Sequence, residues 1–333
     1  MNYQNRRILV GFIFIVGILT FLVIRSSEKG SHHFILAHNL FTDHPTHEGM
    51  VFFAEELKKL SHGKITVTIF PAAQLGTEKD VLALVQLGAI SMTKVSSLSL
   101  EAFNPLFGIL NLPFIFNNQK HYHAVLDSSV GEELLGAITP QKFRGLTYYE
   151  AGDRSFYSHK FIMHPDDIKG LKMRVMDTPS SIRMLKLMGG SPTPMSYGEV
   201  YTALQQGVID GAENNITAIT VNRHGEVSKF FSRDQHIFAP DTLIISEPVW
   251  KSLKEEDQQI IREAADRSKK FQRKLWDQKV MEFEKIARDE MGVQFTTPDK
   301  KPFKEKVQPL IIEYANRGEN YARLIRAIEY FKD

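Results

Sequence analysis

The alternation of strand and helix patterns that begins at Phe34 most constrains the fold of this chain. Residues 34–39 form a short apolar run, residues 47–60 carry apolar side chains at helical spacing, residues 65–70 alternate in polarity, and residues 77–87 are helical again. Strands and helices that follow one another in this way favour a sheet covered by helices. We therefore expect an α/β fold.

The same alternation continues in the middle of the chain. Strands are expected at 145–149 and 170–176, and helices at 178–188 and 199–206. Glycines end both of these helices, as is common at helix carboxyl termini. The α/β pattern thus extends over a second region of the chain.

A long helical stretch is expected after Ser252. Ser252 and Glu255 have the spacing of a capping box, and no Pro or Gly interrupts the chain before Gly292. The apolar stripe on this helix consists of Ile260, Ala264, Phe271, Leu275, Phe283 and Ile286. At 1.5 Å per residue, roughly 37 residues extend about 55 Å. A helix of this length exceeds one lobe and is expected to lie across two.

Length and composition agree with two compact lobes. The chain has 333 residues, of which 43% are hydrophobic and 24% charged, values typical of a globular protein of more than one domain. It contains no cysteine. This excludes a disulfide framework, thiolate metal sites and a thiol nucleophile.

The amino terminus has the pattern of an export segment. Arg6 and Arg7 precede an apolar run from Ile8 to Ile24, and no Ala-x-Ala site follows it. Both a cleaved signal peptide and a membrane anchor fit this pattern. Without the three arginines of the first 26 residues, the chain has 38 basic against 39 acidic residues. This balance gives no support for a nucleic-acid-binding or membrane-binding surface.

The sequence lacks the common catalytic motifs. There is no G-x-S-x-G, G-x-x-x-x-G-K-[ST], G-x-G-x-x-G or H-E-x-x-H. His38, His44 and His47 cluster, but their spacing matches no established zinc site, and His38 is better explained as lining a cleft. We therefore expect no metal and no cofactor. An enzyme that uses these histidines, or Glu199 and Glu213, remains an open alternative.

Two arginines are the strongest candidates for binding. Arg154 lies in a turn that leads into an extended run, and Arg174 lies on the polar face of the strand at 170–176. An arginine can place two parallel hydrogen bonds on one carboxylate, which a lysine cannot do. Taken alone, however, the pattern favours an ordinary ion pair with an internal acid, such as Asp153, Asp167 or Asp177.

The sequence around these arginines resembles a known family. Residues 166–175 read DDIKGLKMRV, residues 192–195 read PTPM, and residues 199–214 read EVYTALQQGVIDGAEN. Shorter matches are FP at 70–71, QLGTE at 74–78, LPFIF at 112–116 and GDRSF at 152–156. From Phe34 to its carboxyl end, the chain is similar to the extracytoplasmic solute-binding proteins of tripartite ATP-independent periplasmic (TRAP) transporters, the DctP type.

The resemblance implies a two-lobed fold like that of periplasmic binding proteins. Crossing hinge strands are expected to join the lobes, and the long helix is expected to span both. Lobe I is then expected to comprise residues 34–151 and 240–279, and lobe II residues 152–239 and 280–333. Residues 1–33 remain as a signal peptide or membrane anchor plus linker.

The resemblance also implies an organic acid in the cleft between the lobes. In this family the arginine that matches Arg174 grips the ligand carboxylate, and the positions of Arg154 and Asn214 commonly assist. Three further positions match residues that fit the rest of the ligand: Asn39, Glu78 and Tyr197. We expect these six residues to form the site.

A departure from the family pattern bears on the ligand. Many dicarboxylate-binding members have Gly-Gln-Glu-Asn-Pro where this chain has GAENN at 211–215. The extra amide of Asn215 suits a hydroxyl-rich ligand, so we expect a sugar acid such as a uronate. A C4-dicarboxylate remains an alternative.

The resemblance finally implies how the protein works. A monomeric periplasmic protein without catalytic activity is expected to deliver the acid to the small and large membrane subunits of a permease, which uses an ion gradient. A sensor that presents the acid to a membrane kinase is an alternative role. No nucleic-acid partner is expected.

Overall fold

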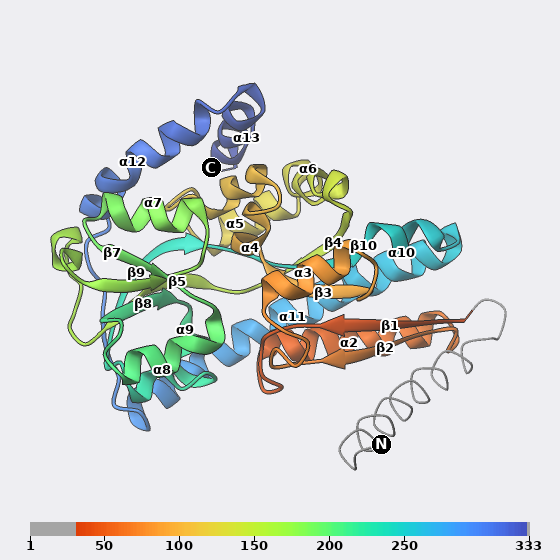
Figure 1. Ribbon diagram of the computed structural model, residues 1–333, viewed down its shortest axis with the longest axis horizontal. Coiled ribbons are helices and arrows are strands. Elements are labelled where there is room, and N and C mark those ends of the chain that lie inside the picture. Colours follow the sequence, from red (N-terminus) through yellow and green to blue (C-terminus); the bar gives the residue numbers. More distant parts are fainter. Residues whose placement is uncertain (1–30, 332–333) are drawn as a thin grey trace, which may run out of the picture.

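The computed structural model describes residues 31–331 and contains two separate β-sheets (Figure 1). The first sheet has the order β2-β1-β3-β10-β4. Its strands are β1 (His32–Ala37), β2 (Ile65–Phe70), β3 (Met92–Ser96), β4 (Phe143–Tyr149) and β10 (Asp241–Ser246). Strands β1, β2 and β3 are parallel, whereas β10 is antiparallel to both of its neighbours. We call this sheet and the helices that cover it the first lobe.

The second sheet has six strands in the order β11-β9-β5-β8-β6-β7. They are β5 (Asp153–Ser158), β6 (Lys172–Val175), β7 (Ser191–Pro194), β8 (Gly211–Asn214), β9 (Phe230–Phe238) and β11 (Gln294–Thr296). This sheet and its helices form the second lobe, which lies on the left in Figure 1.

Two neighbouring connections join the lobes. Strand β4 continues into β5 through residues 150–152, and β9 continues into β10 through residues 239–240. Strand β4 pairs with β10 in the first sheet, and β5 pairs with β9 in the second. The two crossing segments therefore run side by side, as expected for a hinge.

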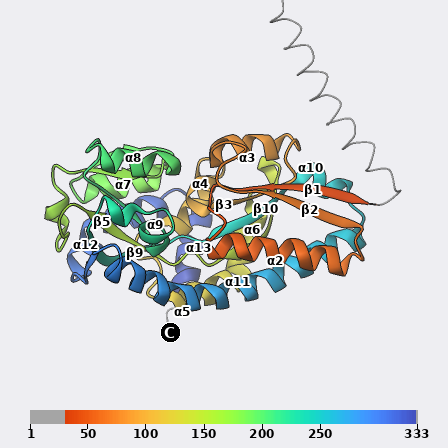
Figure 2. The same cartoon turned by 90° about the horizontal axis from the view of Figure 1, so that it is seen from below.

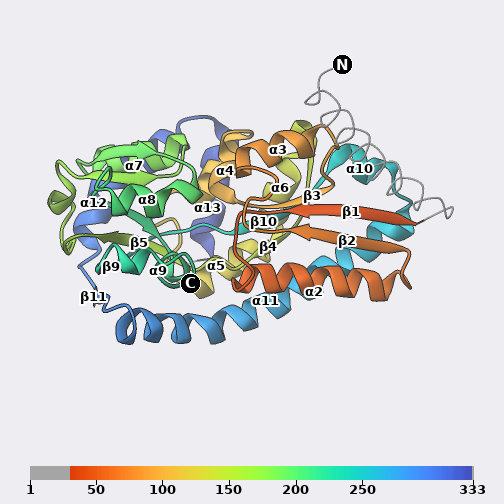
Figure 3. The ribbon, with the colours of Figure 1, turned by 60° about the horizontal axis from the view of Figure 1, so that its bottom comes forward.

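The long helix is α11 (Glu255–Asp289), with 35 residues. At 1.5 Å per residue it extends about 50 Å. It contacts α2 (Pro45–Leu60) and β4 of the first lobe, and α9 (Ile216–Thr220) of the second. Figures 2 and 3 show it running beneath both lobes. The predicted two-lobed α/β fold with a long bracing helix is confirmed.

The details of this helix differ from the sequence prediction. Ser252 ends α10 (Glu247–Ser252) and donates to the backbone oxygen of Val249, so the predicted capping box at Ser252 is wrong. The helix instead begins after Lys254, which makes no side-chain cap. Phe271 is 37% exposed. The buried face is rotated from the predicted stripe and includes Ile261, Ala264, Ala265, Gln272, Trp276 and Phe283.

The other helices cover the sheets and the hinge. The α-helices are α3 (Glu78–Gln86), α4 (Ser97–Glu101), α5 (Gln119–Leu126), α6 (Ser129–Ala137), α7 (Pro179–Leu187), α8 (Val200–Gln205), α12 (Lys301–Ala315) and α13 (Glu319–Tyr330). The 3-10 helices are η1 (Pro105–Asn111), η2 (Thr139–Gln141), η3 (Pro165–Ile168), η4 (Tyr197–Glu199) and η5 (His224–Glu226). At the start of α3, Thr77 and Asp80 form a complete capping box.

The carboxyl-terminal helices contact both lobes. Helix α12 packs against α7 of the second lobe, whereas α13 packs against α6 and η1 of the first. The largest apolar cluster likewise extends from Phe107 and Phe143 in the first lobe to Phe156 and Met184 in the second. The exact division of the chain into lobes therefore remains a prediction.

The predicted export segment at 8–24 lies outside the described residues. Among residues 31–331, the structure contains no helix that is both long enough and apolar enough to cross a membrane.

Candidate functional site

Arg154 forms a buried ion pair with Glu213 on the neighbouring strand β8. Its Nε donates to Glu213 Oε2 at 2.7 Å, and its Nη2 donates to Oε1 at 3.0 Å. Its Nη1 donates to Asn214 Oδ1 at 2.8 Å. The expected pairing with an internal acid thus applies to Arg154, although the partner is Glu213 rather than the adjacent Asp153. The pairing follows from the register, because β5 and β8 are antiparallel neighbours.

His236 and Asp234 extend this network beneath Glu213. The His236 ring lies 2.9 Å from an Asp234 carboxylate oxygen and 3.5 Å from Glu213 Oε2. Burial opposes protonation of His236, but the two carboxylates outweigh it and raise the pKa of His236 to about 9. Burial also disfavours the charged form of Glu213, yet Arg154 and His236 lower its pKa to about 2. No sequence pattern indicated this pairing, which depends on an irregular register between β5 and β9.

Arg174 on β6 is only 3% exposed, but it has a different environment. Its Nε and Nη2 donate to the backbone oxygen of Met195 at 3.3 and 3.0 Å. Among residues 31–331, no carboxylate lies within 4 Å of its guanidinium. Burial lowers the pKa of Arg174; the charge of Glu213 opposes this shift, and that of nearby Arg154 adds to it. A buried guanidinium without a counter-ion is costly, so this arginine is suited to receive an anion.

Tyr197 packs beside Arg174. The Cζ atom of Arg174 lies 5.8 Å from the centre of the Tyr197 ring, a cation–π distance. The Tyr197 hydroxyl donates to Asn222 Oδ1 at 2.7 Å. In this arrangement Tyr197 orients the arginine through its ring, and its hydroxyl proton is already engaged.

The first lobe contributes a second charged cluster, centred on Lys94. This lysine is 2% exposed, and its Nζ donates to Asn39 Oδ1 at 3.3 Å, Glu78 Oε1 at 3.4 Å and Asp241 Oδ1 at 3.2 Å. The sequence prediction included Asn39 and Glu78 but missed Lys94 and Asp241. A lysine within the otherwise uncharged stretch 92–96 was the available signal.

The two clusters face each other across the hinge. The pKa of Asp241 is raised, because burial and the charge of Glu78 outweigh the opposing effects of Lys94 beside it and of Arg154 from the opposite lobe. Burial raises the pKa of Tyr197; the charges of Arg174 and Arg154 oppose this shift, and those of Asp241 and Glu78 on the first lobe add to it. The structure therefore brings the six predicted residues together, two on the first lobe and four on the second.

The three clustered histidines make hydrogen bonds with the protein. Nε2 of His38 lies 3.0 Å from Nδ1 of His47, and Nδ1 of His44 accepts from the Thr46 amide at the start of α2. Burial lowers the pKa of His38 to about 2 and of His44 to about 3, with Lys94 adding to both shifts. In the part of the chain that the structure describes, no three His, Asp or Glu side chains are placed to hold a metal ion. The absence of zinc stays a prediction.

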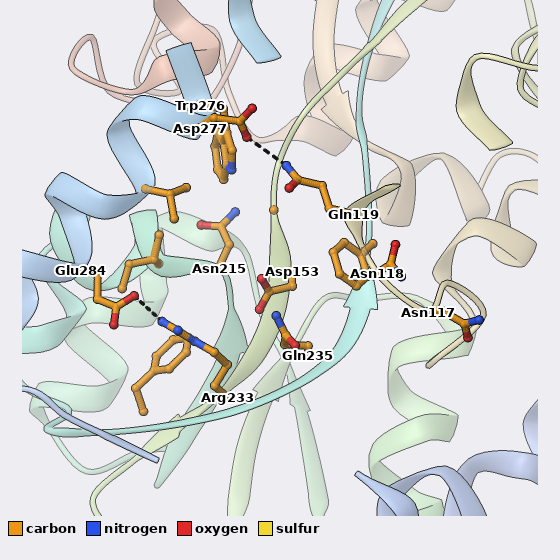
Figure 4. Close-up of a pocket in the computed structure, with 15 residues that line it drawn as sticks. Asn117, Asn118, Gln119, Asp153, Asn215, Arg233, Gln235, Trp276, Asp277 and Glu284 are labelled. Atoms are coloured by element: carbon orange, nitrogen blue, oxygen red, sulfur yellow. Dashed lines mark hydrogen bonds and ion pairs between the residues drawn. The ribbon is translucent and has the colours of Figure 1, made fainter. Parts of the chain in front are cut away.

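A cavity of about 350 Å³ lies behind the hinge (Figure 4). Asp153 lines it, whereas the next residue, Arg154, points to Glu213. Since successive side chains of a strand point to opposite faces, the cavity and the arginine cluster lie on opposite sides of the crossing strands. Gln119 of the first lobe, Gln235 of the second and Trp276 of α11 also line the cavity. The cavity therefore spans both lobes.

Two lobes on a strand hinge, with a buried arginine that lacks a counter-ion between them, define a two-lobed binding protein for an anionic solute. Residues 36–317 match the family described as bacterial extracellular solute-binding protein, family 7 (DctP). The chain belongs to this family, the extracytoplasmic solute-binding proteins of TRAP transporters.

Individual relatives agree with this assignment. The protein YiiZ of Salmonella typhimurium is 38% identical over 279 residues, which cover 83% of this chain and 85% of that protein. A TRAP periplasmic solute-binding protein from Anaerococcus prevotii, solved with bound α/β-D-glucuronate, has a TM-score of 0.88 and 38% identity, covering 90% of this chain and 98% of its own. One from Xanthobacter autotrophicus, with bound β-D-galacturonate, has a TM-score of 0.87 and 36% identity, covering 89% and 99%.

Proposed function

We propose that this protein captures a sugar acid, such as a uronate, in the cleft between its lobes and delivers it to a TRAP permease. The observation that carries the proposal is the buried guanidinium of Arg174, which has no carboxylate within 4 Å among the described residues. A ligand carboxylate that accepts two hydrogen bonds from it supplies the missing charge.

The polar groups around Arg174 support a ligand rich in hydroxyls. Asn214 and the Arg154–Glu213 pair lie on the same lobe, and Asn39, Glu78 and Asp241 face them from the other. Amide and carboxylate groups can each bond a hydroxyl, whereas a C4-dicarboxylate needs a second free cation. Arg154 is already paired with Glu213, which argues against the dicarboxylate alternative. The solved relatives with glucuronate and galacturonate support the sugar acid.

Ligand binding and lobe closure are coupled in this proposal. In this structure Arg154 and Arg174 are 7% and 3% exposed, so both guanidinium groups are shielded from solvent. A ligand shifts a two-state equilibrium only by its differential affinity for the two states. A sugar acid that bonds Arg174 on the second lobe and the cluster of Asn39, Glu78 and Asp241 on the first stabilises the closed state selectively.

The proposed partners are the small and large membrane subunits of the permease, which an ion gradient drives. The proposed location is the periplasm, reached through the apolar segment at 8–24. Catalysis is not part of the proposal, because the carboxylates considered for it are engaged: Glu199 accepts from the Ser196 amide, and Glu213 binds Arg154. The sensor alternative uses the same binding step and differs only in the membrane partner.

A thermal-shift and calorimetric comparison tests the ligand class. The full chain, purified from the cell envelope, is titrated with glucuronate, galacturonate, gluconate, malate and succinate. A ligand at 100 times its Kd stabilises the folded protein by about 2.7 kcal/mol. We expect a uronate to bind more tightly than either dicarboxylate. Tighter binding of succinate than of every sugar acid would contradict the proposal.

A further inference from the structure

The Lys94 cluster has an unusual charge balance. One ammonium group lies between two carboxylates, those of Glu78 and Asp241, at 3.4 and 3.2 Å. These residues and Asn39 form the first-lobe wall of the proposed cleft. With both acids ionised, this wall carries one net negative charge. On the opposite wall, Glu213 balances Arg154, Asp234 balances His236, and Arg174 remains as one net positive charge. The two walls therefore differ in sign.

Lys94 cannot serve as a second anchor for a ligand carboxylate. An ammonium group has three N–H donors, and the three contacts to Asn39, Glu78 and Asp241 use all of them. Its charge is compensated twice within the protein. A ligand carboxylate on this side would meet the two acids without a free cation.

The two carboxylates of the cluster differ in what they can offer a ligand. Oε1 of Glu78 accepts from Lys94 and from the Ser96 amide, and Oε2 accepts from Ser99 at 2.5 Å. Asp241 accepts from Lys94 through Oδ1, and no described residue donates a hydrogen bond to its Oδ2. Asp241 is also only 6% exposed. A carboxylate oxygen that has no hydrogen-bond donor among the described residues, on a residue so little exposed to solvent, is suited to accept a ligand hydroxyl.

We propose that Asp241, held in place by Lys94 and Glu78, is a specificity-determining residue that accepts a ligand hydroxyl and rejects a second carboxylate. The site then selects sugar acids with one carboxylate over those with a carboxylate at both ends. This inference rests on the proposed function. Within it, Glu78 is a positioning residue that holds Lys94, and Asp241 touches the ligand.

Glucuronate, gluconate and glucarate form a suitable test set. Glucarate is gluconate with a carboxylate in place of the terminal CH₂OH, so the two open-chain acids differ mainly in the second charge, and glucuronate adds the ring form. By calorimetry on the full chain, we expect glucarate to bind at least about 100-fold more weakly than the tighter of the other two, because like charges brought together in an interface are strongly unfavourable.

Asp241→Asn tests the role of this residue directly. The substitution keeps the size of the side chain and removes the negative charge, so the preference for one carboxylate should fall by about tenfold or more. Asp289→Asn is the matched control, because it removes the same charge from an exposed position at the end of α11 and should leave the preference unchanged. Glu78→Gln, with folding checked by thermal melting, is a second variant that lowers the charge of the same wall.

The outcomes separate this inference from the proposed function. If none of the three acids binds, both are overturned. If the parent binds glucarate within about threefold of the others, the inference alone is overturned. If the parent discriminates but neither Asp241→Asn nor Glu78→Gln reduces the preference, the assignment to this cluster is wrong.

Discussion

Arg154 and Arg174 are both buried on strands of the same sheet, with β8 between them, yet only Arg154 has a carboxylate partner within 4 Å among the described residues. Glu213 on β8 lies beside Arg154, and its carboxylate accepts two hydrogen bonds from the guanidinium. Arg174 instead meets a backbone oxygen and an aromatic ring. One arginine is thus structural and the other is available to a ligand.

Removing Arg174 should abolish tight binding without destabilising the empty protein. Arg174→Ala should weaken sugar-acid binding by about 2–5 kcal/mol, roughly thirty-fold to several thousand-fold in Kd, because the ligand carboxylate loses its partner. Arg174→Lys should recover little. Without ligand, Arg174→Met should leave the free energy of unfolding unchanged or higher, as it removes an unpaired buried charge. Affinity of Arg174→Ala within about twofold of the parent, measured by calorimetry, would rule out the anchor.

Arg154→Met should destabilise the protein in the absence of ligand, in contrast to Arg174→Met. It leaves the buried carboxylate of Glu213 without its main partner, which should lower the free energy of unfolding by about 3–5 kcal/mol in denaturant titrations without ligand. Arg183→Met is a matched control, because Arg183 pairs with Glu313 on the surface, where an ion pair contributes only about 0–1 kcal/mol. Equal losses in the two variants would show that the Arg154 pair has no special structural role.

Stability should fall on the acid side of neutrality. Burial lowers the pKa of His38 to about 2 and of His44 and His224 to about 3, from about 6.5 in the unfolded chain. Below pH 6.5 the unfolded chain binds protons that the folded one does not, so stability is lost as the pH falls. Each histidine should contribute a slope of about 1.4 kcal/mol per pH unit down to its folded pKa.

His236 should set the alkaline limit. Its pKa is raised to about 9 when folded, so its contribution is complete below pH 6.5 and is lost as the pH rises through about 9. Denaturant titrations from pH 4 to 10 should therefore give the largest free energy of unfolding between about pH 6.5 and about pH 9. The substitution His44→Asn keeps a good amino-terminal cap for α2. On the acid side, the slope of the unfolding free energy against pH should decrease by about 1.4 kcal/mol per pH unit, which corresponds to one proton. An unchanged slope would show that His44 does not titrate as described.

The cavity behind the hinge offers a way to shift the lobes. Opening of the cleft should bring the cavity walls together, because they belong to different lobes and lie on the opposite side of the crossing strands. A bulky side chain in the cavity should oppose opening and raise ligand affinity several-fold. Val280 of α11 lines the cavity, and Val280→Trp is the test. Met281→Trp, at the adjacent and 78% exposed position, is the control. Equal affinities of the two variants in calorimetry would contradict this coupling.

Local patterns in the sequence were sufficient for many elements. The helices α2 and α3 and the strands β2 and β6 lie close to their predicted ranges, because helical spacing, alternation and capping residues act within a few neighbouring residues. Strands β3, β9 and β10 were not recognised. Their pairing partners are distant in the sequence, and β9 also contains a bulge. The sequences MTKVS of β3 and FFSRDQHIF of β9 mix polar and apolar residues without regular alternation, so neither pattern identifies a strand by itself.

The sequence alone determined the α/β pattern, the long helix and, through family resemblance, six candidate residues that the structure places on two facing walls. Only the tertiary structure decided which charges are compensated. The pairing of Arg154 with Glu213 depends on strand register, and that of Lys94 with Asp241 on two strands 147 residues apart. Ion pairing depends on distances of a few ångströms between folded elements, and a linear sequence does not contain these distances.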